Sequence, residues 1–205
     1  MIGVVDYGVG NIQAFLNLFK RIGVEAFRAD KIDRLDDAKW LVLPGVGHFD
    51  HAMQKLNDSG FRSRLEQLVL DQSIPILGIC VGMQMLATSS DEGSLPGLNW
   101  IPGHVRLFEG QKECLGLPIP HMGWNDVQRR PCTKLFSKGF NESPEFYFLH
   151  SYYFDALDSE SVSAKASYGI EFAASVSCGH IHGVQFHPEK SHHWGEQLIK
   201  NFVEL

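Results

Sequence analysis

The sequence predicts an α/β fold in which helices cover both faces of a mixed, mostly parallel sheet, with an additional antiparallel portion in the C-terminal half. In the N-terminal half, short apolar runs typical of strands alternate with segments whose apolar residues recur at helical spacing. Two of these runs, residues 40–43 and the run that follows Pro75, are continuously apolar, as in parallel strands buried on both faces. From about Ser94 onward, strand-like runs are separated by Gly, Pro, Asn and Ser clusters without a long helix between them, which favours antiparallel or mixed pairing.

We expect the elements to follow one another without a domain boundary. In the N-terminal half the patterns predict strands at residues 2–5, 24–29, 40–43 and after Pro75, and helices around residues 12–22, 52–56, 61–69 and from 84–87 onward. In the C-terminal half they predict strands at residues 105–108, 146–149, 171–174 and 181–186, and a final helix from about Trp194. The sequence contains no internal repeat and no linker, so residues 1–205 are expected to form a single domain.

Composition excludes several classes of protein. The formal net charge is -6, and no basic patch is apparent, which argues against a nucleic-acid partner. No apolar run approaches the ~20 residues that cross a bilayer, and the chain starts with a strand-like segment instead of a basic leader. We therefore expect a cytoplasmic protein that does not associate with membranes.

The cysteines are scattered. Cys80, Cys114, Cys132 and Cys178 form no C-x-x-C pair, which argues against a disulfide framework or a cysteine-based zinc site. A lone cysteine is most often an unreactive, small buried side chain. Cys80 differs from the other three in its local sequence.

Cys80 lies where a predicted strand meets a predicted helix. Gly78 and Gly82 flank it at two residues on either side, the pattern of a sharp strand-to-helix elbow in which larger side chains would collide. Such an elbow presents the thiol outward, and the N-terminus of a helix stabilises a thiolate. The sequence therefore predicts that Cys80 is a nucleophile.

A nucleophilic thiol needs a base, and the base needs a group that orients it. Among the ten histidines, His187 stands out because Pro188 keeps it extended, so that Glu189 is expected on the same face, two residues on. Cysteine, histidine and glutamate together form a constellation for acyl transfer.

Two glycine-containing loops follow the predicted strands at residues 2–5 and 40–43. The loop at residues 44–49 can present backbone N–H groups to a developing oxyanion, although it can equally be a simple strand-to-helix turn. The loop at residues 6–10 lacks the third glycine of a dinucleotide fingerprint and the lysine of a P-loop, which argues against a nucleotide site. Asn11 is a natural N-cap for the helix that follows. Because both loops and Cys80 follow strands, we expect them at one edge of the sheet.

Several segments resemble signature segments of known enzymes. Four resemble the class I, triad-type glutamine amidotransferases: Gly78-Ile-Cys80-Val-Gly82-Met-Gln84, Pro44-Gly-Val-Gly47, His187-Pro-Glu189-Lys-Ser191 and Phe148-Leu-His150-Ser-Tyr152. Two others resemble more narrowly the glutaminase subunits of imidazole glycerol phosphate synthases, enzymes of histidine biosynthesis: Asp6-Tyr-Gly-Val-Gly-Asn11 and Pro120-His-Met-Gly-Trp-Asn125. The resemblance covers essentially the whole chain in the family's order, and it implies a flavodoxin-like sheet of the class I glutamine amidotransferase type.

The resemblance also implies roles for individual residues. Cys80 would attack the side-chain amide of glutamine, and His187, oriented by Glu189, would protonate the departing ammonia and then activate water. The backbone N–H groups of Val81 and of the Val46–Gly47 segment would hold the oxyanion. No cofactor and no metal is implied.

Further residues match the family's positions for substrate and partner. The positions that match glutamine recognition are Gln84, Glu92, Ser151 and Tyr152, and an acid such as Glu92 suits the ammonium group of free glutamine, although it can also be a solvated loop acid. The family's interface with a (β/α)8-barrel cyclase is matched at Asn11, Met122, Trp124 and Lys190. That partner would form a heterodimer with this chain and use the ammonia to make imidazole glycerol phosphate and AICAR.

Three other interpretations remain open from the sequence. The continuation His192-His193-Trp194 is unusual for the histidine-pathway subunits, and a paralogue that supplies ammonia for surface-sugar modification is an alternative. A metal-binding protein that uses His180, His182, His187, His192 and His193 is disfavoured, because no Cys or Asp joins them at ligand spacing. A catalytically silent regulatory subunit is disfavoured because all three triad residues are present.

Overall fold

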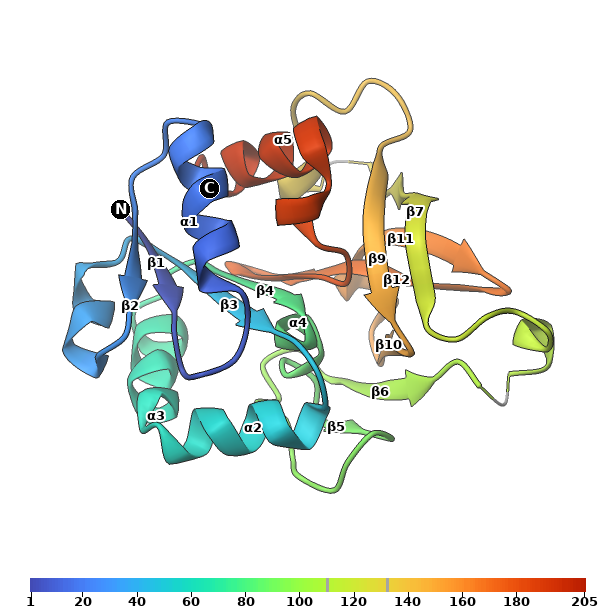
Figure 1. Ribbon diagram of the computed structural model, residues 1–205, viewed down its shortest axis with the longest axis horizontal. Helices are drawn as coiled ribbons and strands as arrows, with labels where there is room; N and C mark the ends of the chain where they lie inside the picture. The colour runs from blue at the N-terminus through green and yellow to red at the C-terminus, as the bar shows by residue number, and fades with distance from the viewer. Residues whose placement is uncertain (110, 132) are drawn as a thin grey trace.

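The structure, a computed structural model, describes residues 1–109, 111–131 and 133–205 of the chain and is built around one large mixed sheet (Figure 1). Within these residues, eleven strands form a sheet in the order β2-β1-β3-β4-β13-β12-β10-β6-β5, with β11 paired to β12 and β8 to β11, and β7 pairs with β9 in a second sheet. In the first half the strands are β1 (Ile2–Val5), β2 (Ala26–Ala29), β3 (Trp40–Gly45), β4 (Ile76–Cys80), β5 (Ser89–Ser90) and β6 (Gly103–Leu107). In the second half they are β7 (His121–Asp126), β8 (Gln128–Arg129), β9 (Glu145–His150), β10 (Tyr152–Ala156), β11 (Val162–Tyr168), β12 (Ile170–Cys178) and β13 (Ile181–Val184).

Helices cover both faces of the large sheet, as the sequence predicts. Helices α1 (Ile12–Arg21) and α5 (His192–Phe202) lie on one side. Helices α2 (Phe49–Asp58), α3 (Phe61–Glu66) and α4 (Val81–Gln84) lie on the other (Figure 1). The Asn11 side chain caps α1 by accepting a hydrogen bond from the amide of Ala14 at 3.1 Å, as expected.

The parallel part of the sheet is formed by β2, β1, β3, β4 and β13. Strand β4 is buried along its whole length and lies between β3 and β13, with Gly45 opposite Cys80 at its carboxyl end. Because parallel strands end at the same edge, the segments that follow β3, β4 and β13 converge there. This edge carries the candidate site.

The helix after Cys80 differs from the expectation. The pattern predicts that a helix begins at residues 84–87, whereas α4 begins at Val81 and ends at Gln84. The chain leaves the helix there because the carbonyls of residues 85–87 accept hydrogen bonds from amides of the loop 98–101. These bonds to the loop replace the bonds that a longer helix would make.

The C-terminal half is mixed, as expected, but it contains strands that the pattern does not predict. Strand β13 pairs in parallel with β4 and antiparallel with β12, so it joins the two parts of the sheet. The hydrophobic pattern does not predict β7, because its apolar side chains face solvent and a polar one is buried. Met122 is 66% exposed and Trp124 is 44% exposed, whereas His121, between the sheets, is only 3% exposed. The hydrophobic pattern does not predict β10 and β11 either, because polar residues interrupt their apolar positions. No helix in the described residues has the length and apolar character needed to cross a membrane.

Candidate active site

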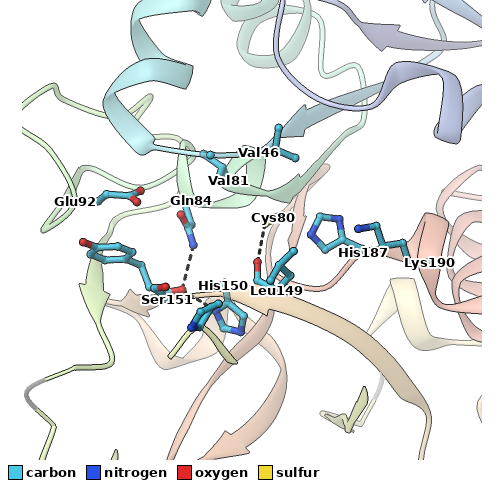
Figure 2. Close-up of a pocket in the computed structure, with 13 residues that line it drawn as sticks. Val46, Cys80, Val81, Gln84, Glu92, Leu149, His150, Ser151, His187 and Lys190 are labelled. Carbon is cyan, nitrogen blue, oxygen red and sulfur yellow. Dashed lines mark hydrogen bonds between the residues drawn. The ribbon is translucent and has the colours of Figure 1, made fainter. Parts of the chain in front are cut away.

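A cavity of about 260 Å³ opens at the carboxyl edge of the sheet, and Cys80 forms part of its wall (Figure 2). It collects residues from segments that lie far apart in the sequence. They are Val46, Gly47, Cys80, Val81, Gln84, Glu92, Pro120, Leu149, His150, Ser151, Tyr152, His187 and Lys190. The structure therefore brings the expected nucleophile, base, oxyanion and glutamine-recognition positions to one place.

Cys80 occupies a sharp elbow between β4 and α4. Its backbone has φ 56° and ψ -114°, a region that non-glycine residues rarely adopt and that is often strained at functional sites. The surrounding backbone is too close for side chains: a Cβ on Gly45 would lie 2.2 Å from the amide nitrogen of Gly82, and a Cβ on Gly78 would lie 2.5 Å from the carbonyl oxygen of Gly82. The glycines predicted to permit the elbow do so by allowing this close packing.

The Cys80 thiol is buried and has weak polar contacts. Its Sγ lies 3.8 Å from the carbonyl oxygen of Leu149, and Figure 2 shows this contact as a dashed line. The side-chain amide of Gln185 donates to the same sulfur at 3.8 Å. These contacts orient the sulfur toward the cavity wall formed by the end of β9.

His187 and Glu189 form a buried pair next to Cys80. The Nδ1 of His187 donates to Oε1 of Glu189 at 2.8 Å, which leaves Nε2 for the thiol. His187 is extended, as Pro188 predicts, but Glu189 lies in a short 3₁₀ turn (Pro188–Lys190) instead of continuing the extended segment. The turn still places the carboxylate beside the ring, so the expected pairing holds although the expected backbone does not.

The surroundings favour the protonated form of His187. Burial disfavours the imidazolium, but the hydrogen bonds with Cys80 and Glu189, together with the negative charges of both groups, more than offset burial and raise the pKa of His187 to about 10. An imidazolium beside a cysteine sulfur favours the thiolate and can give up a proton. His187 can therefore activate the sulfur as a nucleophile and act as a proton donor.

The backbone segments expected to hold an oxyanion line the cavity. They are Val46 and Gly47, which follow β3, and Val81 at the N-terminus of α4. Among the described residues, the Val46 and Gly47 amides donate no backbone hydrogen bond. The strand β3 continues through Gly45, so this loop is shorter than the sequence suggests, and the hydroxyl of Tyr7 fixes its start by donating to the carbonyl of Pro44 at 2.7 Å.

The expected glutamine-recognition residues lie at the other end of the cavity (Figure 2). Gln84 donates to the carbonyl oxygen of Tyr152 at 3.1 Å. The carboxylate of Glu92 accepts from the amide of Phe49 at 2.8 Å, and burial raises its pKa. Glu92 is thus a half-buried acid in the cavity wall and not a solvated loop acid.

The four positions expected at a subunit interface lie outside or at the rim of the cavity. Met122 and Trp124 project from the outer face of β7, and the Trp124 ring stacks on His192 with centroids 5.2 Å apart. Lys190 lines the cavity and also a smaller hollow of about 70 Å³, which Asn11 and Glu189 line as well. All four are exposed, so a partner could cover them without rearranging the core.

The sequence matches a known family over almost its full length: the model of "Glutamine amidotransferase class-I" matches residues 3–205. The chain belongs to the class I glutamine amidotransferases. Among curated relatives, an imidazole glycerol phosphate synthase subunit HisH from Bdellovibrio bacteriovorus is 53% identical over 205 residues, with all of both chains covered. Subunits of the same name from Leptospira borgpetersenii and Pseudomonas aeruginosa (there HisH 2) are 46% and 45% identical, again over all of both chains.

Solved structures give the same fold for this amidotransferase. A crystal structure of a glutamine amidotransferase has a TM-score of 0.77 at 21% identity, covering 99% of this chain and 97% of the other. A structure of PurLQS from Thermotoga maritima has a TM-score of 0.70 at 18% identity, with coverage of 99% and 97%. At this identity the likeness concerns the fold alone.

Sequence reasoning missed several polar residues of this amidotransferase. Gln185 is fully buried and bridges the Gln84 amide, at 3.0 Å, and the Cys80 sulfur. A glutamine inside the apolar run before His187 was the signal that could have revealed it. His121 and His150 lie within the motifs quoted above, but the sequence assigned no role to either.

The histidines considered for a metal site are used otherwise. His180 donates to the carbonyl of Val69 at 2.7 Å, and His182 pairs with the hydroxyl of Ser177 at 2.8 Å. Across residues 1–109, 111–131 and 133–205, no group of three or more His, Cys, Asp or Glu side chains could hold a metal ion. Cys114 and Cys178 are free thiols, whereas Cys132 lies outside the described residues.

Proposed function

We propose that this chain is the glutaminase subunit of an imidazole glycerol phosphate synthase, with Cys80, His187 and Glu189 as its triad. It hydrolyses glutamine to glutamate and ammonia, and the ammonia serves histidine biosynthesis. The observation that carries the chemistry is the buried His187–Glu189 pair beside the thiol of Cys80 in a cavity. Relatives 44–53% identical over the full chain support the pathway and favour it over surface-sugar modification.

The first half of the reaction forms a thioester. The Cys80 thiolate attacks the side-chain amide carbon of glutamine, and the carbonyl electrons move to the oxygen, which the N–H of Val81 and one from the Val46–Gly47 segment stabilise. His187 then gives its proton to the nitrogen as the C–N bond breaks. Ammonia leaves, and the γ-glutamyl group stays on the sulfur.

The second half releases glutamate. Neutral His187 now takes a proton from water, and the resulting hydroxide attacks the thioester carbon. The C–S bond breaks, and the sulfur leaves as a thiolate beside the imidazolium. Glu189 holds the ring in the same orientation in both halves, so each proton transfer uses the same ring nitrogen, Nε2.

Recognition of glutamine uses the opposite end of the cavity. We assign the ammonium group to the half-buried carboxylate of Glu92 and the rest of the amino-acid moiety to Gln84 and the Ser151–Tyr152 segment. A half-buried carboxylate attracts a cation more strongly than an exposed one, because water screens its charge less. This arrangement leaves the side-chain amide over Cys80.

The ammonia is passed to a partner subunit, which we identify as a (β/α)8-barrel cyclase in the cytoplasm. The relatives are named as subunits of a synthase, which supports a complex. Asn11, Met122, Trp124 and Lys190 form the exposed face that the cyclase would cover. An exposed Met–Trp surface beside an active site is typical of a protein–protein interface.

The test separates the two activities of the complex. In Cys80→Ser, glutamine-dependent formation of imidazole glycerol phosphate should be abolished, whereas formation from added ammonium salts should remain, because the partner performs the second reaction. Loss of both activities in a variant that still folds and binds its partner would contradict this division of labour. Wild-type glutamine hydrolysis by Cys80→Ala would instead exclude Cys80 as the nucleophile.

A further inference from the structure

Two buried histidines lie side by side between the two sheets, and the reaction above uses neither. His121, on β7, is 3% exposed, and His150, at the end of β9, is 6% exposed. The Nδ1 of His121 lies 2.9 Å from the Nε2 of His150. His150 also lines the active-site cavity (Figure 2).

The partners of the two rings determine which atoms carry hydrogens. His150 Nδ1 lies 2.7 Å from the carbonyl oxygen of Tyr152, which can only accept, so this nitrogen is the donor and Nε2 is an acceptor. The Nδ1 of His121 must then donate to His150. The Nε2 of His121 accepts in turn from the side-chain amide of Asn125 at 3.2 Å, and that amide also donates to the carbonyl of Ser167 at 2.9 Å.

Both rings are neutral in this arrangement. Burial lowers the pKa of His121 to about 4. Burial, together with the neighbouring His121 and His187, lowers the pKa of His150 to about 3, although the hydrogen bond to the Tyr152 carbonyl acts in the opposite direction. A neutral imidazole has one donor and one acceptor, and each of these rings uses both.

The hydrogen bonds continue from Tyr152 to the nucleophile. The Tyr152 carbonyl that accepts from His150 also accepts from the side-chain amide of Gln84 at 3.1 Å. Gln84 donates to Gln185 at 3.0 Å, and Gln185 donates to the Cys80 sulfur at 3.8 Å. One chain of hydrogen bonds therefore links β7, the glutamine-recognition end of the cavity and the thiol.

We propose that His121 and His150 are positioning residues for glutamine: as a neutral pair, they fix the Tyr152 carbonyl and, through it, the Ser151–Tyr152 segment and the Gln84 amide. The inference rests on the proposed function and extends it to residues that do not react. The carbonyl belongs to the first residue of β10, and a single residue, Ser151, makes the bend that separates β10 from β9. Without the imidazole, this carbonyl would lose a partner, and the bend would lose the contact that sets its orientation.

Because both rings pack against aromatic side chains, a substitution can keep the packing of each ring and remove its hydrogen bonds. His121 stacks between Phe148, with centroids 4.9 Å apart, and Tyr168, with centroids 4.1 Å apart. His150 packs edge-on against Phe108 at 5.3 Å. Because both sites are aromatic, phenylalanine can fill them, and a His→Phe substitution removes chiefly the hydrogen bonds.

The variants are chosen to remove or keep the donor to Tyr152. His150→Phe and His121→Phe break the chain at its two rings. His150→Asn keeps a side-chain N–H near the position of Nδ1 and can restore the bond to the carbonyl. His182→Phe is the matched control, because His182 is 2% exposed, has a pKa that burial lowers to about 4, and does not line the active-site cavity.

The experiment measures glutamine-dependent kinetics of each variant in complex with the partner subunit. We expect His150→Phe to raise the KM for glutamine on the order of 10-fold or more while kcat changes by less than about threefold, with a smaller rise for His121→Phe. His150→Asn should recover most of the loss, and His182→Phe should leave the KM unchanged. Ammonium-dependent product formation should stay at the wild-type level in all four complexes.

A second measurement removes the dependence on turnover. Bound glutamine should slow alkylation of Cys80 by iodoacetamide, and His150→Phe should require correspondingly more glutamine for half-protection. An unchanged KM and unchanged protection in folded His150→Phe would overturn the proposal, as would an equal rise in His182→Phe, which would indicate general destabilisation. If His150→Phe does not fold, His121→Phe decides by the same criteria. Absence of glutamine hydrolysis by the wild-type complex would instead refute the proposed function.

Discussion

The backbones of Gly82 and Leu43 approach so closely that a Cβ on Gly82 would lie 2.0 Å from the carbonyl oxygen of Leu43. Gly82→Ala must therefore separate α4 from the end of β3, and we expect it to lower the free energy of unfolding by at least about 2 kcal/mol and to abolish glutaminase activity. Gly23→Ala is the control, because Gly23 has φ +72° but no neighbour within 4 Å, so only left-handed strain of about 1–2 kcal/mol applies. Urea denaturation measures the free energy of unfolding of both variants, and an equal decrease in the two would contradict the role of close packing.

The carboxylate of Glu189 should control the pH range in which His187 is protonated. Glu189→Gln keeps a hydrogen-bond acceptor for Nδ1 but removes the charge that helps to raise the pKa of His187 to about 10. We expect the alkaline limb of the kcat/KM profile for glutamine to move to lower pH, and kcat to fall on the order of 10²-fold or more. Glu171→Gln, which loses only a surface ion pair with Lys165, should leave the profile unchanged. An unshifted alkaline limb in Glu189→Gln would rule out this electrostatic role.

The buried histidines should make stability depend on pH on both sides of a maximum. Burial lowers the pKa of His121 and His182 from 6.5 to about 4 and that of His150 to about 3, so between pH 6.5 and these values the unfolded chain binds more protons and stability falls with falling pH. His187, whose folded pKa is raised to about 10, binds more protons when folded, and its contribution is lost as pH rises from 6.5 toward 10.

These four groups place the stability maximum at about pH 7, slightly above 6.5, because three of them bind a proton on unfolding and only His187 binds one on folding. Each of the three neutral histidines contributes a slope of up to about 1.4 kcal/mol per pH unit on the acid side. His182→Phe should therefore reduce the acid slope by the equivalent of one proton, as measured by urea denaturation between pH 4 and 6.5. An acid slope identical to that of the wild type would contradict the lowered pKa of His182.

The exposed face of β7 should contribute to binding of the partner subunit. Trp124→Ala removes a large aromatic side chain that lies flat on His192, and we expect the Kd for the partner subunit to rise on the order of 10- to 100-fold. Leu157→Ala is a matched control, because Leu157 is 81% exposed but lies outside this face. Calorimetry or surface plasmon resonance measures the Kd, and an equal affinity of the two variants would exclude Trp124 from the interface.

Local sequence was sufficient for the reactive centre. The glycines around Cys80 and the Pro188 that follows His187 act on their immediate neighbours, so the elbow and the His187–Glu189 pair could be predicted from spacing alone. The parallel half of the sheet could also be predicted from the sequence, because strands buried on both faces are continuous apolar runs. The helix after Cys80 was predicted too far along the chain, because the loop at residues 98–101, which ends it, is not a local feature.

Only the tertiary structure decided which polar groups support that centre. His121 and His150 are separated by 29 positions, and Gln185 lies 105 positions from the Cys80 sulfur to which it donates. In the sequence, these polar residues interrupt the apolar runs and argue against buried strands. Burying a polar side chain is unfavourable unless it has a hydrogen-bond partner, and the partner is known only from the folded structure. The sequence by itself determined the elbow that carries Cys80 and the pairing of His187 with Glu189. The packing of two sheets determined that a pair of neutral imidazoles lies behind the cavity, because only folding brings each donor to its acceptor.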